Sequence, residues 1–139
     1  MLVRQISAKH EWVDTGMSVE AGDVLSFSAE GTWVDLWIRC SADGYWAPFF
    51  YMFNILPRIP DEQRYFRLMG RIVRDGLQPK EDDAQETFPI GKAATITARW
   101  AGRLFVFAND RPGFYGNNRG SVSLTVARRS NSSHEVSGN

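Results

Sequence analysis

The chain has 139 residues, and its 16 basic residues balance its 16 acidic ones. The length suits one domain with an ordinary hydrophobic core. The even charge argues against a nucleic-acid-binding protein, which usually carries a basic excess. Cys40 is the only cysteine, so an intrachain disulfide is excluded.

The N-terminus lacks the continuous apolar core of a secretory signal. The most apolar stretch, Tyr45–Ile59, contains two prolines and is shorter than the about 20 residues that a membrane span needs. We therefore expect a soluble chain without a membrane span, either cytoplasmic or exported by a route that uses no signal peptide. Residues 1–128 are expected to form one domain, and the polar segment 129–139 to be a disordered tail.

Alternation of apolar and polar residues predicts strands along the chain. Asp23–Val34 alternates imperfectly, whereas Ala93–Trp100 and Gly120–Arg128 alternate clearly. Gly102–Asp110 is a nearly continuous apolar run, as the core of a sandwich allows. Glu62–Gly76 fits a helical stripe or a strand, and its neighbours favour a strand preceded by a short turn of helix. The pattern predicts an all-β, jelly-roll sandwich of about eight strands.

The sequence shows no catalytic constellation. It contains no G-x-S-x-G elbow, phosphate-binding loop or H-E-x-x-H motif. Cys40 has no histidine near it in sequence, so we interpret it as a small, partly buried residue rather than a nucleophile. The acidic run Lys80–Glu86 could bind a cation, but it is more typical of a solvated loop. We therefore do not expect an enzyme.

The loop Asn109–Asn118, NDRPGFYGNN, is the strongest candidate site. Calcium takes about six to eight oxygen ligands from carboxylates, amides and main-chain carbonyls. Asp110 ends one predicted strand, and Asn117 and Asn118 precede the next, so adjacent strands would bring these side chains together. Spacing alone leaves a second interpretation open, since Asn, Asp and Gly are also the usual residues of a turn that binds nothing.

Two longer blocks carry a family resemblance. Phe107–Val126, with the pattern N-D-x-P-G-x-Y-G-N-N-x-G-S-x-S, strongly resembles the calcium-containing loop and last strand of the PA-IL-type galactophilic bacterial lectins. Val19–Gly31 resembles the early G-D-V strand of that family, and Tyr45–Pro48 is weakly similar to its W-G-P. The resemblance implies a small jelly-roll β-sandwich, a bound calcium ion, a homo-oligomer and a galactose-like ligand.

The resemblance also implies a ligand set. Asp110 matches the carboxylate ligand of calcium, and Asn117 and Asn118 match its two amide ligands. Phe114 and Asp35 stand where the family uses main-chain carbonyls. Sugar hydroxyls, the 3- and 4-hydroxyls of galactose in the family, would complete the coordination, with Asp110 and Asn117 also hydrogen-bonded to them.

Part of the family's sugar site is altered here. The family has a His and a Gln on a neighbouring loop, but the corresponding region, Ser41–Arg64, has no His, and its Gln63 cannot be assigned. Arg111 stands where the family touches the sugar face, so an acidic or otherwise modified sugar is an alternative to galactose. We expect the aromatic block Tyr45–Phe53 to fill a core or a subunit contact, with Trp46 and Tyr45 the choices for any sugar contact.

Two functions therefore stay open. The first is a calcium-dependent carbohydrate-binding protein, a lectin without catalysis. The alternative is a calcium-stabilised structural or interaction module that binds no free sugar.

Overall fold

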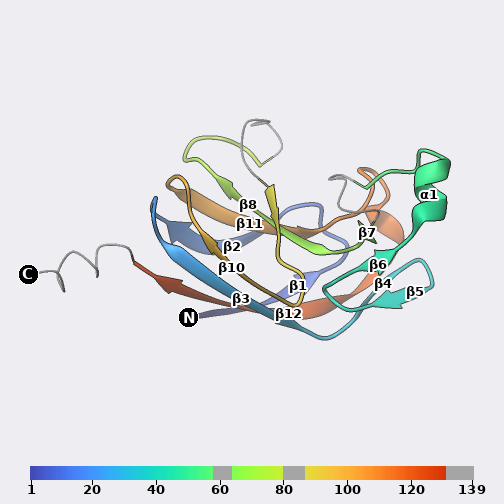
Figure 1. The fold of residues 1–139 in the computed structure, drawn as a ribbon, viewed down its shortest axis with the longest axis horizontal. Coiled ribbons are helices and arrows are strands. Elements are labelled where there is room, and N and C mark those ends of the chain that lie inside the picture. Colours follow the sequence, from blue (N-terminus) through green and yellow to red (C-terminus); the bar gives the residue numbers. More distant parts are fainter. Residues whose placement is uncertain (58–63, 80–86, 131–139) are drawn as a thin grey trace, which may run out of the picture.

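The computed structural model describes residues 1–57, 64–79 and 87–130. It confirms the predicted all-β sandwich, built from two antiparallel sheets that face each other (Figure 1). The elements are β1 (Leu2–Ser7), β2 (Val13–Val19), β3 (Val24–Glu30), β4 (Trp33–Asp35), β5 (Ile38–Cys40), β6 (Tyr45–Trp46), α1 (Pro48–Met52), β7 (Arg64–Tyr65), β8 (Leu68–Val73), β9 (Thr87–Pro89), β10 (Ala93–Thr97), β11 (Gly102–Ala108), η1 (Tyr115–Asn117) and β12 (Asn118–Arg129).

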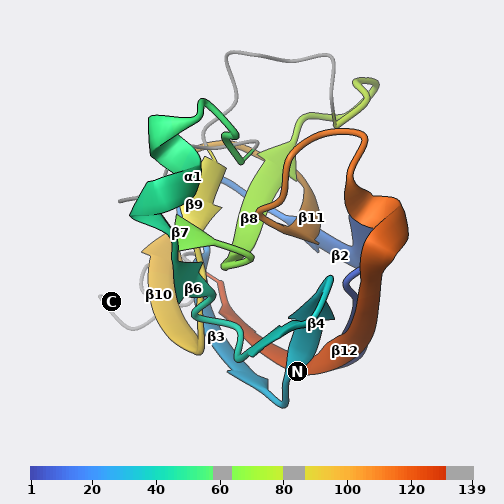
Figure 2. The same cartoon turned by 90° about the vertical axis from the view of Figure 1, so that its right-hand side faces the viewer.

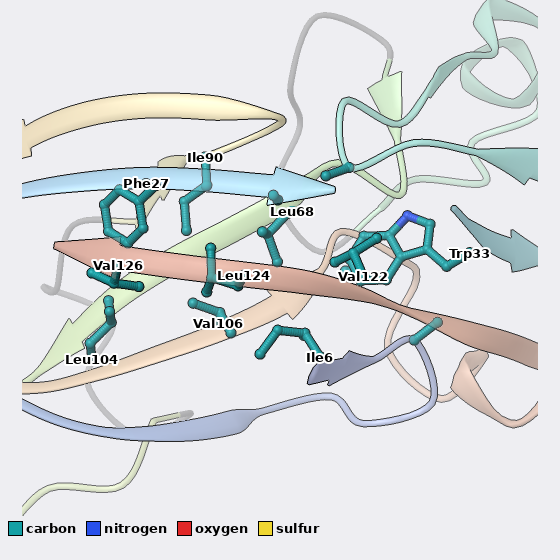
Figure 3. Close-up of a cluster of buried hydrophobic side chains, with 14 of the residues drawn as sticks. Ile6, Phe27, Trp33, Leu68, Ile90, Leu104, Val106, Val122, Leu124 and Val126 are labelled. Carbon is teal, nitrogen blue, oxygen red and sulfur yellow. The ribbon is translucent and has the colours of Figure 1, made fainter. Parts of the chain in front are cut away.

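The larger sheet has the order β10-β3-β12-β4-β5, with β1 also paired to β12. The second sheet has the order β2-β11-β8-β9, and a separate small ribbon joins β6 to β7. Apolar side chains from both sheets meet between them, as Figure 3 shows for Phe27 and Leu124 on one side and Leu68 and Val106 on the other. This inward alternation is what the strand pattern of the sequence requires.

The long strand β12 connects the core to the end of the sandwich. It pairs with β3 through Ser123–Arg129 and with β4 through Asn118–Gly120. The segment predicted as one strand, Asp23–Val34, is thus broken into β3 and β4, and Gly31 has a φ of +102° at the break. Because β4 follows this break, its last residue lies opposite the first residue of β12.

Four segments gather at that end: the β4–β5 hairpin, α1, the β6–β7 ribbon and the loop between β11 and β12 (Figures 1 and 2). The helix α1 lies within the aromatic block, which showed no helical pattern in the sequence. It leaves Phe49 and Phe53 62% and 61% exposed, so these two side chains do not fill the core. Gly44 precedes β6 with a φ of +75°, and a Cβ there would lie 2.2 Å from the Tyr65 carbonyl oxygen. Only glycine therefore fits this approach.

The N-terminus and the described end of β12 lie apart from this region (Figure 1). Strand β12 runs as far as Arg129, the first residue of the expected tail, and residues 131–139 lie outside the described part. Within the described residues, helix length and hydropathy both fall short of what a bilayer crossing requires.

Candidate functional site

Strand register places two of the sequence-predicted residues opposite each other. Asp35 ends β4, Asn118 begins β12, and the two are direct partners in the antiparallel pairing. Opposite residues in such a pair lie about 4.5–5.5 Å apart. Both residues are buried, Asp35 at 8% exposure and Asn118 at 0%. A carboxylate and an amide that are 83 positions apart in the sequence are thus brought together by the sheet.

The amide of Asn118 is fixed in one orientation. Its Nδ2 donates a 2.8 Å hydrogen bond to the carbonyl oxygen of Ala8, in the loop after β1. Its Oδ1 is buried and accepts no hydrogen bond from any residue that the structure describes. A buried acceptor without a donor costs about 1–3 kcal/mol, so such an atom in a native fold calls for an explanation. A cation is one.

Asp110 is the second buried carboxylate among the predicted site residues, at 5% exposure. Its Oδ1 accepts a 2.7 Å hydrogen bond from the main-chain N–H of Arg111. The buried ring of Tyr115 holds the start of the loop, since its hydroxyl donates to the Ala108 carbonyl at 2.5 Å and accepts from the Asp110 N–H at 3.3 Å. The tyrosine of the N-D-x-P-G-x-Y pattern therefore anchors the Asp110 main chain.

Tyr45 interacts with both buried carboxylates, through a hydrogen bond to Asp35 and through the charge of Asp110. Its hydroxyl donates a 2.5 Å hydrogen bond to Asp35 Oδ2. Burial, followed by this hydrogen bond and the charges of Asp35 and Asp110, raises the pKa of Tyr45, so the hydroxyl stays protonated and keeps donating. Burial also raises the pKa of the Asp35 carboxyl, and the Tyr45 hydrogen bond offsets part of that rise. Tyr45, expected as a sugar contact, is thus the partner of Asp35 in this structure.

An aromatic chain continues from Tyr45 to the helix. The Tyr45 ring stacks on Tyr65 with centroids 5.8 Å apart, and Phe50 meets Tyr65 edge-on at 5.3 Å. Phe49 lies 6.4 Å from Phe50 and 4.8 Å from Phe53. The position of α1 is thereby tied to the same tyrosine that holds Asp35.

The remaining predicted residues lie at the rim of the site. Asn117 is exposed at the end of η1, and Phe114 is 49% exposed. The guanidinium of Arg111 lies 5.1 Å from the centre of the Phe114 ring, a cation–π contact that holds it beside the loop. Trp46 is 66% exposed next to α1. Gln63 and the acidic run Lys80–Glu86 lie outside the described residues.

The predicted calcium ligands do not form a cluster of acidic side chains. Among the described residues, no three His, Cys, Asp or Glu side chains are grouped to hold a metal ion. The predicted set instead combines the Asp110 carboxylate with two amide side chains and two main-chain carbonyls, and all of these are hard donors of the kind that calcium prefers.

Sequence reasoning missed the tip of the β4–β5 hairpin. Leu36 and Trp37 form the turn between the paired residues Asp35 and Ile38. Leu36 has a φ of +58°, a conformation that costs a non-glycine residue about 1 kcal/mol or more. Trp37 projects from this turn with 80% of its surface exposed. The sequence signal that could have pointed to this hairpin tip was the tryptophan two residues after the candidate Asp35.

Cys40 provides a pH prediction. It lies opposite Trp33 in the β4–β5 pair, and burial, followed by the charge of Asp35, raises the pKa of its thiol from 9.0 to about 12. We expect the folded protein to resist alkylation at pH 8 and the denatured protein to react. Because the folded pKa is the higher one, its stabilising contribution is full below pH 9 and is lost as the pH rises towards 12.

Iodoacetamide labelling followed by mass spectrometry measures this difference, and a Cys40→Ser variant controls for reaction at other side chains. Fast labelling of the folded chain at pH 8 would contradict the burial of the thiol.

Comparisons with known proteins bear on the fold. A scan against protein-family models finds no match, and a search of curated proteins finds none either. Among solved structures, the chain is similar to one described as the EclA N-terminal domain, a PllA-like lectin, with a TM-score of 0.62 and 21% sequence identity. The likeness covers 93% of this chain and 97% of that one. At this identity it shows a shared fold, the β-sandwich of a lectin domain.

Proposed function

We propose that the chain is a calcium-dependent carbohydrate-binding protein, a lectin that performs no catalysis. The buried Oδ1 of Asn118 carries this proposal, because its amide is locked by Ala8 and its free acceptor lies beside the buried Asp35. A calcium ion would satisfy this atom. It would also neutralise the carboxylate charge that burial makes costly.

The proposed calcium ligands come from the β11–β12 loop and the end of β4. The side chains of Asp110, Asn117 and Asn118 would hold the ion, together with the main-chain carbonyls of Phe114 and Asp35. Bound calcium would supply positions for outside oxygens, which adjacent hydroxyls of a pyranose suit. Tyr45 would keep the Asp35 carboxylate in place, and Asp110 and Asn117 would hydrogen-bond the same sugar hydroxyls.

Two further observations support sugar as the ligand. The solved chain with the same fold is described as a lectin, and it matches this chain over nearly its full length. The rim also presents an arginine and exposed tryptophans, groups that hydrogen-bond and stack on sugar rings. Galactose or a related modified sugar is the ligand class we propose.

Calorimetry and a glycan array, each run with calcium and with a chelator, test the proposal. We expect calcium to bind with heat and to raise the melting temperature, and glycan binding to disappear in chelator. Calcium binding without any glycan signal would instead support the alternative, a calcium-stabilised interaction module. The absence of both heat and a melting shift would leave the loop a simple turn.

Replacing Arg111 by alanine should leave calcium binding intact and change sugar preference. A positively charged side chain does not act as a calcium ligand. The Arg111 guanidinium instead presents up to about five hydrogen-bond donors at the rim, and it pairs well with carboxylates. Titration with a galactoside and then with a uronic acid measures the change. Arg103→Ala serves as the matched control, because Arg103 lies at the end of β11 away from the loop that carries Arg111. Loss of calcium in the Arg111 variant would contradict this division.

We also expect a homo-oligomer, which would raise avidity for clustered glycans without any new contact. Light scattering measures the assembly state directly.

A further inference from the structure

Exposed apolar side chains are concentrated at the end that carries the candidate site. Eleven large hydrophobic residues are exposed in the described chain, and eight of them belong to the hairpin tip, the α1 region and the β11–β12 loop. Figure 2 looks onto this end and shows the three segments around it. The eight are Leu36, Trp37, Trp46, Phe49, Met52, Phe53, Ile55 and Phe114. Such a concentration on a folded domain marks an interaction surface.

The most exposed of these side chains lie on different segments. Trp37 and Met52 are 80% and 79% exposed, on two separate segments. The helix that carries Met52 is held by the edge-on contact of Phe50 with Tyr65 in β7. The surface therefore consists of exposed apolar side chains on anchored segments, and the polar candidate site lies between these segments. We call it the apolar rim.

In the described part of the chain, three arginines lie beside these apolar side chains, and one acidic side chain, Glu11, is exposed where it accepts a hydrogen bond from the Gly113 N–H of the β11–β12 loop. Arg39 and Arg119 are exposed on β5 and β12, and the Nη2 of Arg119 donates to the Leu36 carbonyl at 3.3 Å. Arg111 stands beside Phe114. The acidic residues between these arginines, Asp35 and Asp110, are buried. Tryptophan and phenylalanine tips accompanied by arginines are typical of surfaces that enter the headgroup region of a bilayer.

We propose that the apolar rim is a membrane-contact surface, which lies against a lipid bilayer with its aromatic tips at the headgroup level and its arginines on lipid phosphates. A second copy of the chain fits less well, since a protein surface seated here would close the site to which we assign sugar binding, whereas a bilayer can itself carry a glycan at that site. That last step rests on the proposed function, whereas the distribution of apolar tips and arginines does not. A membrane-attached glycan would then meet the site directly.

Vesicle binding without any sugar or calcium tests this surface independently of the lectin proposal. The full chain is sedimented with vesicles of phosphatidylcholine, with and without phosphatidylserine and free of glycolipid, in the presence of a chelator. We expect binding that strengthens with phosphatidylserine, together with a blue shift of tryptophan emission. The double variant Trp37→Ser, Phe49→Ser should bind at least about tenfold more weakly.

The control is Val3→Ser with Leu77→Ser, which removes two exposed apolar side chains on other segments and should bind as the wild type does. Arg39→Gln with Arg119→Gln should remove most of the dependence on phosphatidylserine. Both variants change exposed residues, and thermal melts check that they fold. No sedimentation at millimolar lipid, or equal binding by all variants, would overturn the proposal. So would dissociation of an oligomer by the Trp37, Phe49 variant without any change in lipid binding.

Discussion

Replacing Asp110 by alanine should abolish calcium binding, and with it sugar binding and the calcium-dependent rise in melting temperature. In the proposed ligand set Asp110 is the charged side chain that the loop contributes, and calcium affinity depends on the charge of the ligands. Asp110 is 5% exposed, and its Oδ1 accepts a hydrogen bond from the Arg111 N–H, so its carboxylate is held in place. Calcium at about 100 times its Kd stabilises a folded protein by about 2.7 kcal/mol, and this is the increment that should disappear.

Calorimetry measures the lost heat, and melts with and without calcium measure the lost stabilisation. The matched control is Asp14→Ala, because Asp14 is an exposed aspartate in a 3.0 Å ion pair with Arg103. An exposed pair is worth about 0–1 kcal/mol, so this change should leave the calcium response intact. An Asp110 variant that still binds calcium, or still binds sugar, would place the ion elsewhere.

Local patterns were sufficient to predict the fold class. Strands β10 and β11 lie within segments whose alternation or continuous apolar run was visible in the sequence, and β12 extends the alternating segment Gly120–Arg128 at both ends. Strand β2 also alternates, but one inward position is Thr15, whose hydroxyl donates to the Leu104 carbonyl at 2.8 Å. Because a hydrogen-bonded threonine occupies an inward position, a count of apolar residues in the sequence did not identify this strand.

The helix α1 could not be predicted in the same way. Five residues are too few for a helical period to show, and a proline and three aromatic residues favour no single interpretation. Its place comes from tertiary contacts, since Phe50 rests on Tyr65 and Tyr65 rests on Tyr45. The exposure of Phe49 and Phe53 follows from those contacts and not from their hydrophobicity.

The candidate site was predictable in its loop but not in its partners. The spacing of Asp110, Asn117 and Asn118 was enough to predict an oxygen-rich loop. The pairing of Asn118 with Asp35 depends on the break at Gly31, and the bond from Asn118 to Ala8 depends on where the β1–β2 loop lies. Tyr45 was selected for its aromatic ring, whereas the hydrogen bond from its hydroxyl to Asp35 depends on tertiary packing that local sequence patterns do not show.

The second large effect concerns the core beneath the site. Replacing Trp33 by alanine should destabilise the fold by about 3–5 kcal/mol, a large part of the about 5–15 kcal/mol that holds a domain together. Trp33 is fully buried, and its ring meets Phe66 edge-on with centroids 5.4 Å apart. It also pairs with Gly120 in β12, two positions before Asp35. Its loss would loosen the strand that presents the site.

Trp37 provides a control of the same residue type, because it lies just past the end of the same strand and is 80% exposed. Trp37→Ala should change the free energy of unfolding by no more than about 0.5 kcal/mol. Trp33→Phe should fall between the two, since it keeps an aromatic ring against Phe66. Urea denaturation in chelator measures all three variants without the contribution of calcium. Equal losses at positions 33 and 37 would mean that Trp33 does not support the core in the way its burial indicates, and the link from core to site would then fail.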